Sequence, residues 1–106
     1  FSPYHIRDFT PRETVAFVRD NYPGRRAYVS FDADKYAVLF YWVLSGMNEA
    51  DLLMDGPGLS VESIAPGTLL ILNKPDEVDP LQDRFGFTGV VLLRDDGYQK
   101  VYLVLQ

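Results

Sequence analysis

Two carboxylates, one residue apart, are the residues whose type and spacing best suit chemistry. Asp32 and Asp34 directly follow the run 26–31, which alternates apolar and other side chains and is predicted to be a strand. Hard divalent cations bind such oxygens, and open α/β sheets bind ligands outside the carboxyl ends of their strands. Acidic residues also gather at helix N-termini, where the helix dipole favours them without any ligand. We therefore keep Asp32 and Asp34 as candidate ligand-binding residues and predict no metal site.

Lys74 is the third candidate ligand-binding residue. It follows the run 68–73, whose sequence TLLILN is typical of a buried strand. If both strands end at the same edge of a sheet, Lys74 can approach Asp32 and Asp34 and pair with them. An exposed pair of this kind contributes only about 0–1 kcal/mol.

No other part of the sequence resembles a catalytic or phosphate-binding motif. Nucleophilic catalysis needs a base beside a serine or threonine, but the only histidine is His5 and there is no Gly-x-Ser-x-Gly elbow. The stretch 55–60, DGPGLS, is rich in glycine, but it contains Pro57 and has no lysine before Ser60, so we interpret it as a turn. We predict no catalytic residue and no cofactor.

The elements that must position these residues begin with a helix and a strand. Thr10 suits the N-cap of a helix, Pro11 suits its first position, and Glu13 completes a capping box. The pair Pro23-Gly24 ends this helix before the strand at 26–31.

The next predicted element is a strongly apolar helix at 34–45. The ten residues Tyr36–Ser45 carry no charge, which is about half of the roughly 20 apolar residues that span a membrane. A helix that is apolar nearly all round is buried on more than one side. We therefore expect Trp42 to be buried and Phe40 and Leu44 to contact the sheet. The alternative is that one aromatic face of this helix meets a membrane surface or a parent domain.

The rest of the chain predicts a mixed sheet. A short strand at 50–54 and a turn at 55–58 lead into 59–64, which suits either a helical turn or a strand. After the strand at 68–73, Asp79, Pro80 and Gly86 are typical of the N-cap, first position and end of a helix. Strands at 89–94 and 99–105 flank Asp96-Gly97, a strong hairpin turn.

The order of these elements predicts an α/β fold. We expect one small sheet, with its early strands parallel and a C-terminal antiparallel hairpin, and two to three helices packed on it. Residues 10–106 form a single domain, and 1–9 are a lead-in from an upstream region. Because the sequence starts at Phe1, we expect it to be cut from a longer protein or processed.

Composition narrows the possible partners. The chain has 106 residues, a net charge of −5 and a hydrophobic fraction of 47%, which suits one globular domain. Only three residues are lysine and positive charge is not clustered, so we expect no nucleic-acid partner. The absence of cysteine excludes a disulfide or a thiolate metal site.

Several segments resemble a known family when they are taken together. The stretch TPRETVAFVRDNYPGRRAYVSFD at 10–32, followed by DKYAVLFYWVLSG at 34–46, is similar to the soluble C-terminal domain of certain bacterial membrane glycosyltransferases. These enzymes belong to the dolichyl-phosphate-mannose protein mannosyltransferase superfamily, which includes the aminoarabinose transferases of lipid A. Tyr28 and Phe40-Tyr41 stand where the family has aromatic residues, and 67–105 is similar to the end of the family region.

The resemblance implies a function for a larger enzyme. The chain would be a non-catalytic domain of a polyprenyl-phosphate-sugar-dependent membrane glycosyltransferase, on the extracytoplasmic (periplasmic) side of the bacterial inner membrane. Its partner would be the membrane-embedded part of the same parent chain, where the family has its catalytic acidic residues. It would assist binding of the polyprenyl-phosphate sugar or of the glycan acceptor.

Two alternatives come from the residues themselves. One is a free-standing module that binds a small ligand through Asp32, Asp34 and Lys74. The other is a protein-interaction domain that uses the terminal hairpin as an edge, since the last strand carries few charges to protect it.

Overall fold

The predicted α/β fold is confirmed. The computed structural model describes residues 3–106, with side chains from residue 10 onward. A five-stranded mixed sheet has the strand order β2-β1-β3-β5-β4. The strands are β1 (Ala27–Val29), β2 (Leu52–Leu53), β3 (Leu69–Leu72), β4 (Val90–Asp95) and β5 (Lys100–Val104).

The strand directions also match the prediction. Strand β1 pairs in parallel with both β2 and β3, while β5 is antiparallel to β3 and to β4. Asp96-Gly97 lies in the turn that joins β4 to β5, as its sequence predicts. One irregularity occurs in this hairpin, where the pairing of β4 with β5 shifts between Leu92 and Arg94.

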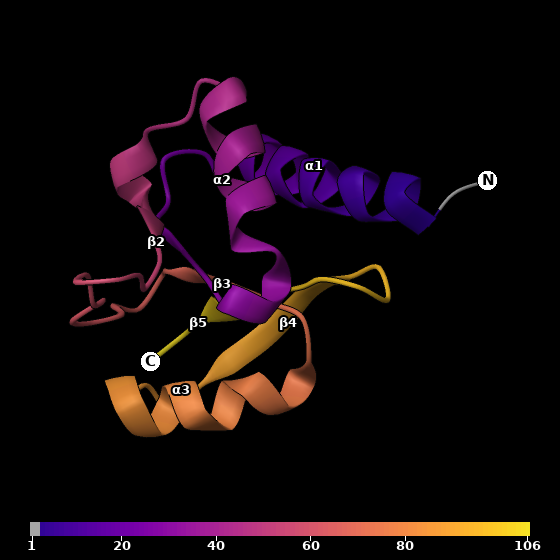
Figure 1. Cartoon of the computed structure of the whole chain (residues 1–106). Helices are drawn as coiled ribbons and strands as arrows, with labels where there is room; N and C mark the ends of the chain where they lie inside the picture. The colour runs from indigo at the N-terminus through magenta and orange to yellow at the C-terminus, as the bar shows by residue number, and fades with distance from the viewer. Residues whose placement is uncertain (1–2) are drawn as a thin grey trace.

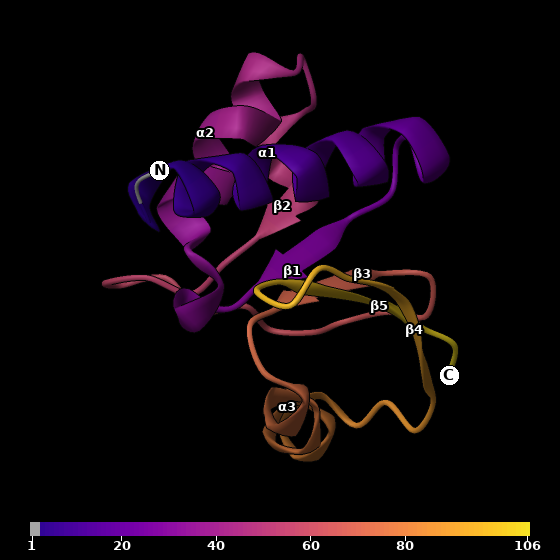
Figure 2. The same cartoon turned by 90° about the vertical axis from the view of Figure 1, so that its right-hand side faces the viewer.

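Helices cover both faces of the sheet. Helices α1 (Pro3–Asn21) and α2 (Lys35–Leu44) pack together on one face, and α3 (Val78–Phe85) covers the other (Figures 1 and 2). Three short 3-10 turns complete the fold: η1 (Phe31–Ala33), η2 (Glu49–Asp51) and η3 (Pro75–Glu77). Among the described residues, no helix combines the length and the apolar character needed to cross a membrane.

The central strand β3 explains why its sequence is apolar throughout. Leu69 and Ile71 face the core under α1 and α2, where they join Val15, Val38 and Trp42. Leu70 and Leu72 face the second core, under α3. A strand that is buried on both faces has no position for a polar side chain, hence the run LLIL.

The predicted start of the first helix is wrong. Helix α1 begins at Pro3, so Thr10 and Pro11 lie inside it. Nothing at 4–10 stops a helix, because this stretch contains no glycine or proline. The helix therefore continues through Pro11, although a proline inside a helix lowers its stability. The backbone of residues 3–9 of the predicted lead-in is part of this helix, while residues 1–2 lie outside the described residues.

The predicted N-cap of α3 is also wrong, but its end is confirmed. The helix begins at Val78, directly after η3, so Asp79 lies within the first turn. Gly86 ends the helix with φ of 80°, a left-handed conformation that glycine adopts without strain. Segment 59–64, for which the sequence allows a helical turn or a strand, forms neither, apart from an isolated bridge between Leu59 and Gly56.

Helix α2 is buried on one side only. Trp42 is fully buried, as predicted, and its indole Nε1 donates to the carbonyl oxygen of Asn48 at 2.7 Å. The prediction that Phe40 and Leu44 contact the sheet is wrong, since their side chains are 59% and 69% exposed. The core beneath α2 is filled by Val38 and Trp42 together with α1, which leaves the opposite side of the helix uncovered.

Candidate functional site

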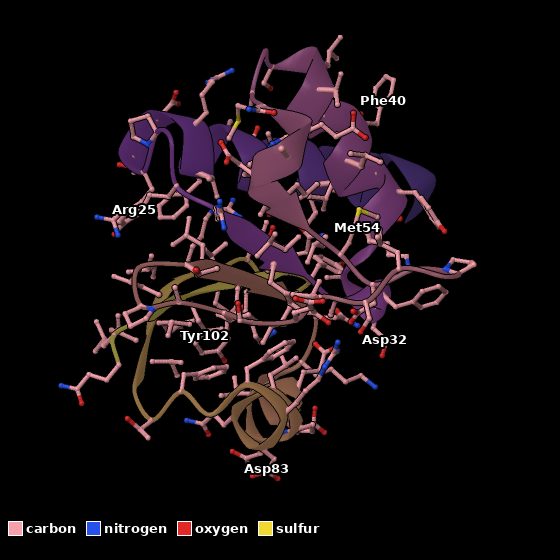
Figure 3. The ribbon with its side chains drawn as sticks, turned by 90° about the vertical axis from the view of Figure 1, so that its left-hand side faces the viewer. Arg25, Asp32, Phe40, Met54, Asp83 and Tyr102 are labelled. Atoms are coloured by element: carbon pink, nitrogen blue, oxygen red, sulfur yellow. The ribbon has the colours of Figure 1, made fainter. Side chains whose placement is uncertain are left out.

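The three predicted ligand-binding residues lie at one edge of the sheet but are not joined. Asp32 is in η1, Asp34 precedes α2 and Lys74 precedes η3, and all three are exposed. Figure 3 shows Asp32 at the outside of the molecule. No ion pair between Lys74 and either aspartate occurs in the described part of the chain, so the expected pairing is not formed.

Other residues connect the strand ends at this edge. The Ser30 hydroxyl donates to Glu77 Oε1 at 3.0 Å, and Glu77 Oε2 accepts from the backbone N–H groups of Asn73 and Lys74 at 2.7 and 2.8 Å. Ser30 directly follows β1 and Asn73 directly follows β3. Glu77 thus closes the carboxyl edge between β1 and β3, and its position within an acidic pair of the sequence did not reveal this role.

A cleft lies between α2, β2 and the segment 55–63. Its volume is about 890 Å³, and its walls are mostly apolar, with Tyr36, Leu39, Leu52, Leu53, Met54 and Leu59 among them. Arg26, Glu49 and Glu62 also line it, and all three are exposed at its rim. A concave apolar site with a few polar groups is the usual form of a small-molecule site.

Lys35 is the charged residue inside this cleft. It is 6% exposed and is the one charged side chain that is buried among the described residues. Its ammonium Nζ donates to the backbone oxygen of Asp55 at 2.6 Å and lies 5.0 and 5.2 Å from the ring centres of Phe31 and Tyr36. No ion pair in the described part of the chain includes Lys35. Sequence reasoning missed this residue, although it is the only charged residue of α2.

The outer wall of the cleft, segment 55–63, is held by the Asp55 carboxylate. Arg84 of α3 binds this carboxylate through both terminal nitrogens, at 2.7 and 2.9 Å. The Tyr28 hydroxyl donates to Asp55 at 2.9 Å, and the Val61 N–H donates at 2.8 Å. Arg84 also donates to the Val61 oxygen at 2.9 Å. The Asp55 carboxylate thus links the segment to Tyr28 in β1 and to Arg84 in α3, and it also links Asp55 to Val61 within the segment.

These contacts fix the charge states of the group. The pKa of Asp55 lies well below its usual range, mainly because Arg84 hydrogen-bonds the charged form, with Val61 and Tyr28 adding to this effect. Burial, together with the hydrogen bond to Asp55, raises the pKa of Tyr28 to about 12. At neutral pH Asp55 is a carboxylate engaged by three donor groups, and Tyr28 is a neutral donor. The group therefore holds the wall in place and offers no free base.

A second surface adjoins the cleft on the outer side of α2. We call Tyr36, Phe40, Val43 and Leu44 the α2 outer face, and all four side chains are more than half exposed. They line a shallow hollow of about 380 Å³ together with Leu39 and Glu49. Because Tyr36, Leu39 and Glu49 also line the cleft, the two surfaces are continuous. Figure 3 shows Phe40 pointing away from the body of the protein.

Comparison of the chain with protein-family models, with curated proteins and with solved structures finds no match. Among the side chains that the structure describes, from residue 10 onward, no group of three or more histidine, aspartate and glutamate residues could hold a metal ion. The cleft, Lys35 and the α2 outer face are therefore the features that can carry a function.

Proposed function

We propose that this chain is a non-catalytic domain of a polyprenyl-phosphate-sugar-dependent membrane glycosyltransferase. It would lie on the extracytoplasmic (periplasmic) side of the bacterial inner membrane and pack against the membrane-embedded part of the same parent chain. The resemblance of segments 10–32 and 34–46 to that family supports this proposal, and so does the character of one surface.

The α2 outer face is the observation that carries the proposal. Four large apolar side chains cover one side of a ten-residue helix that has no charge after Lys35. Isolated exposed apolar residues are ordinary, but contiguous ones that line a hollow mark a surface that meets a partner. Burying such a surface contributes about 25 cal/mol per Å² of apolar area. A membrane-embedded partner offers apolar residues at the level of the lipid headgroups that suit this face.

In this arrangement the domain supports the enzyme by position. Docking through α2 would place the neighbouring cleft and the edge with Asp32, Asp34 and Lys74 beside the membrane domain. From there the domain would assist binding of the polyprenyl-phosphate sugar or of the glycan acceptor, while the catalytic residues belong to the membrane part.

The complete gene provides the first test. We expect the reading frame upstream of the Phe1 codon to encode a series of membrane spans. A start codon directly upstream, with no spans before it, would exclude the proposal. Given the spans, replacing Phe40 and Leu44 with serine should lower transferase activity in membranes and leave the folding of the isolated domain unchanged. Replacing the exposed α3 residue Asp83 with serine is the matched control and should change neither.

A further inference from the structure

We propose that the cleft between α2, β2 and segment 55–63 binds a small amphipathic monocarboxylate, whose carboxylate meets the Lys35 ammonium and whose apolar body lies against the cleft wall. This binding site does not depend on the glycosyltransferase assignment, although it adjoins the α2 outer face and shares Tyr36 with it.

Lys35 is incompletely paired in the structure. An ammonium group has three N–H donors, and the structure gives Lys35 one acceptor, the backbone oxygen of Asp55. The ring faces of Phe31 and Tyr36 add cation–π attraction but no counter-charge. Buried charges are normally paired, because removing an ion from water is costly. An anionic group in the cleft would complete the pairing of Lys35.

The cleft has the size and the apolar walls of a small-ligand site. Its volume of about 890 Å³ is at the upper end of the roughly 300–1,000 Å³ typical of small-ligand sites. Leu39, Leu53, Met54 and Leu59 give it apolar walls that suit an alkyl or aryl body. A ligand with one charged end and an apolar remainder matches this division between Lys35 and the walls.

The outer wall of the cleft is already held in position. Arg84, Tyr28 and the Val61 N–H hold Asp55, and Gly56 and Leu59 exchange two backbone hydrogen bonds of 2.9 Å. A ligand would not have to order this segment, and this lowers the cost of binding.

The charged residues at the rim of the cleft limit the charge that a ligand can carry. Glu49 and Glu62 are exposed at the rim, while the carboxylate of Asp55 is engaged by Arg84. Arg26 is the rim cation. The acidic residues at the rim repel an anion with more than one charge more strongly than they repel a carboxylate, which carries a single charge at neutral pH. This balance favours a carboxylate over a phosphate monoester.

Calorimetric titration with four probes of one chain length tests the proposal, at concentrations below micelle formation. The probes are decanoate, decyl phosphate, decanol and decyltrimethylammonium. We expect decanoate to bind saturably to one site and at least about tenfold more tightly than the other three, since about 1.4 kcal/mol corresponds to a factor of ten. Equal binding of decanoate and decanol, or tighter binding of the phosphate or of the cation, would overturn the proposal.

Variants locate the site. Lys35→Met keeps the apolar stem and should weaken decanoate binding at least about tenfold, while the exposed Lys74→Met should leave it unchanged. Ala50 is exposed and lines the cleft, so Ala50→Trp should place a large ring in the cleft and weaken decanoate binding without disturbing buried contacts. This second variant gives a result even if Lys35→Met fails to fold, which circular dichroism would reveal. Decanoate binding that is unchanged in Ala50→Trp, or that is lost in Phe40→Ser, would place the probe elsewhere and refute the site.

Discussion

Phe40 and Trp42 lie two residues apart in α2 and occupy opposite environments. Trp42 is fully buried and its indole N–H donates a hydrogen bond to the backbone oxygen of Asn48, whereas the Phe40 side chain is 59% exposed. Two residues correspond to about 200° of rotation around a helix, so the two side chains point to opposite sides. The helix therefore has a core side and the uncovered α2 outer face.

This difference predicts opposite responses to truncation. Trp42→Ala should lower the free energy of unfolding by about 3–5 kcal/mol, because it leaves a cavity under α2. Phe40→Ala should change the free energy by no more than about 0.5 kcal/mol, as is usual for surface positions. Urea denaturation followed by circular dichroism measures both values. A loss above about 1 kcal/mol for Phe40→Ala would show that this side of the helix is buried.

The acid side of the stability profile should depend on Asp55. Its folded-state pKa is lowered from an unfolded value of about 3.9, so its contribution to stability is fully present above about pH 5 and is lost as the pH falls below about 4. The gap in stability between wild type and Asp55→Asn should thus be widest near neutral pH and narrow towards pH 3. Urea denaturation across this range measures the gap.

Two controls accompany the Asp55 measurement. The side chains of Arg84 and Asp55 are 39% and 36% exposed, so solvent screens the pair and salt should reduce the gap. Asp83→Asn, on the exposed side of α3, should follow the wild-type profile. A gap between wild type and Asp55→Asn that is constant with pH would contradict the role given to the Asp55 charge.

Tyr28 should keep its phenolic proton to an unusually high pH. Its pKa is raised to about 12, so the folded protein keeps this proton where an unfolded chain loses it near pH 10. The stability that it contributes is fully present below about pH 10 and is lost as the pH rises from about 10 to 12. Near-ultraviolet absorbance of wild type and Tyr28→Phe gives the titration of Tyr28 by difference. A difference curve centred near pH 10 would contradict the burial of Tyr28 together with its contact to Asp55.

The sheet could be predicted from the sequence because its signals are local. The run LLIL marks a strand buried on both faces, and Asp96-Gly97 marks the hairpin. The length of the apolar run predicts helix α2, but it does not predict which side of the helix faces the core. When nearly every position is apolar, no polar stripe shows which side faces solvent, so Phe40 and Leu44 were placed in the core.

The candidate site could be predicted only in part. The edge with Asp32, Asp34 and Lys74 follows from the order of the strands, but the ion pair expected there is not formed. The contact between Lys35 and Asp55 spans 20 residues and depends on how segment 55–63 folds back. That course is set by Arg84, a further 29 residues along the chain from Asp55, and nothing in the local sequence indicates such a distant tie.

The most direct test of the proposed function is photocrosslinking of the full-length protein in its membrane. A benzoylphenylalanine would replace Phe40 in one variant and Asp83, which lies at the opposite end of the molecule in Figure 3, in the other. We predict that position 40 crosslinks to membrane-embedded segments of the same chain and that position 83 does not. Equal crosslinking from both positions, or no crosslink from position 40 to the membrane part, would contradict docking through the α2 outer face.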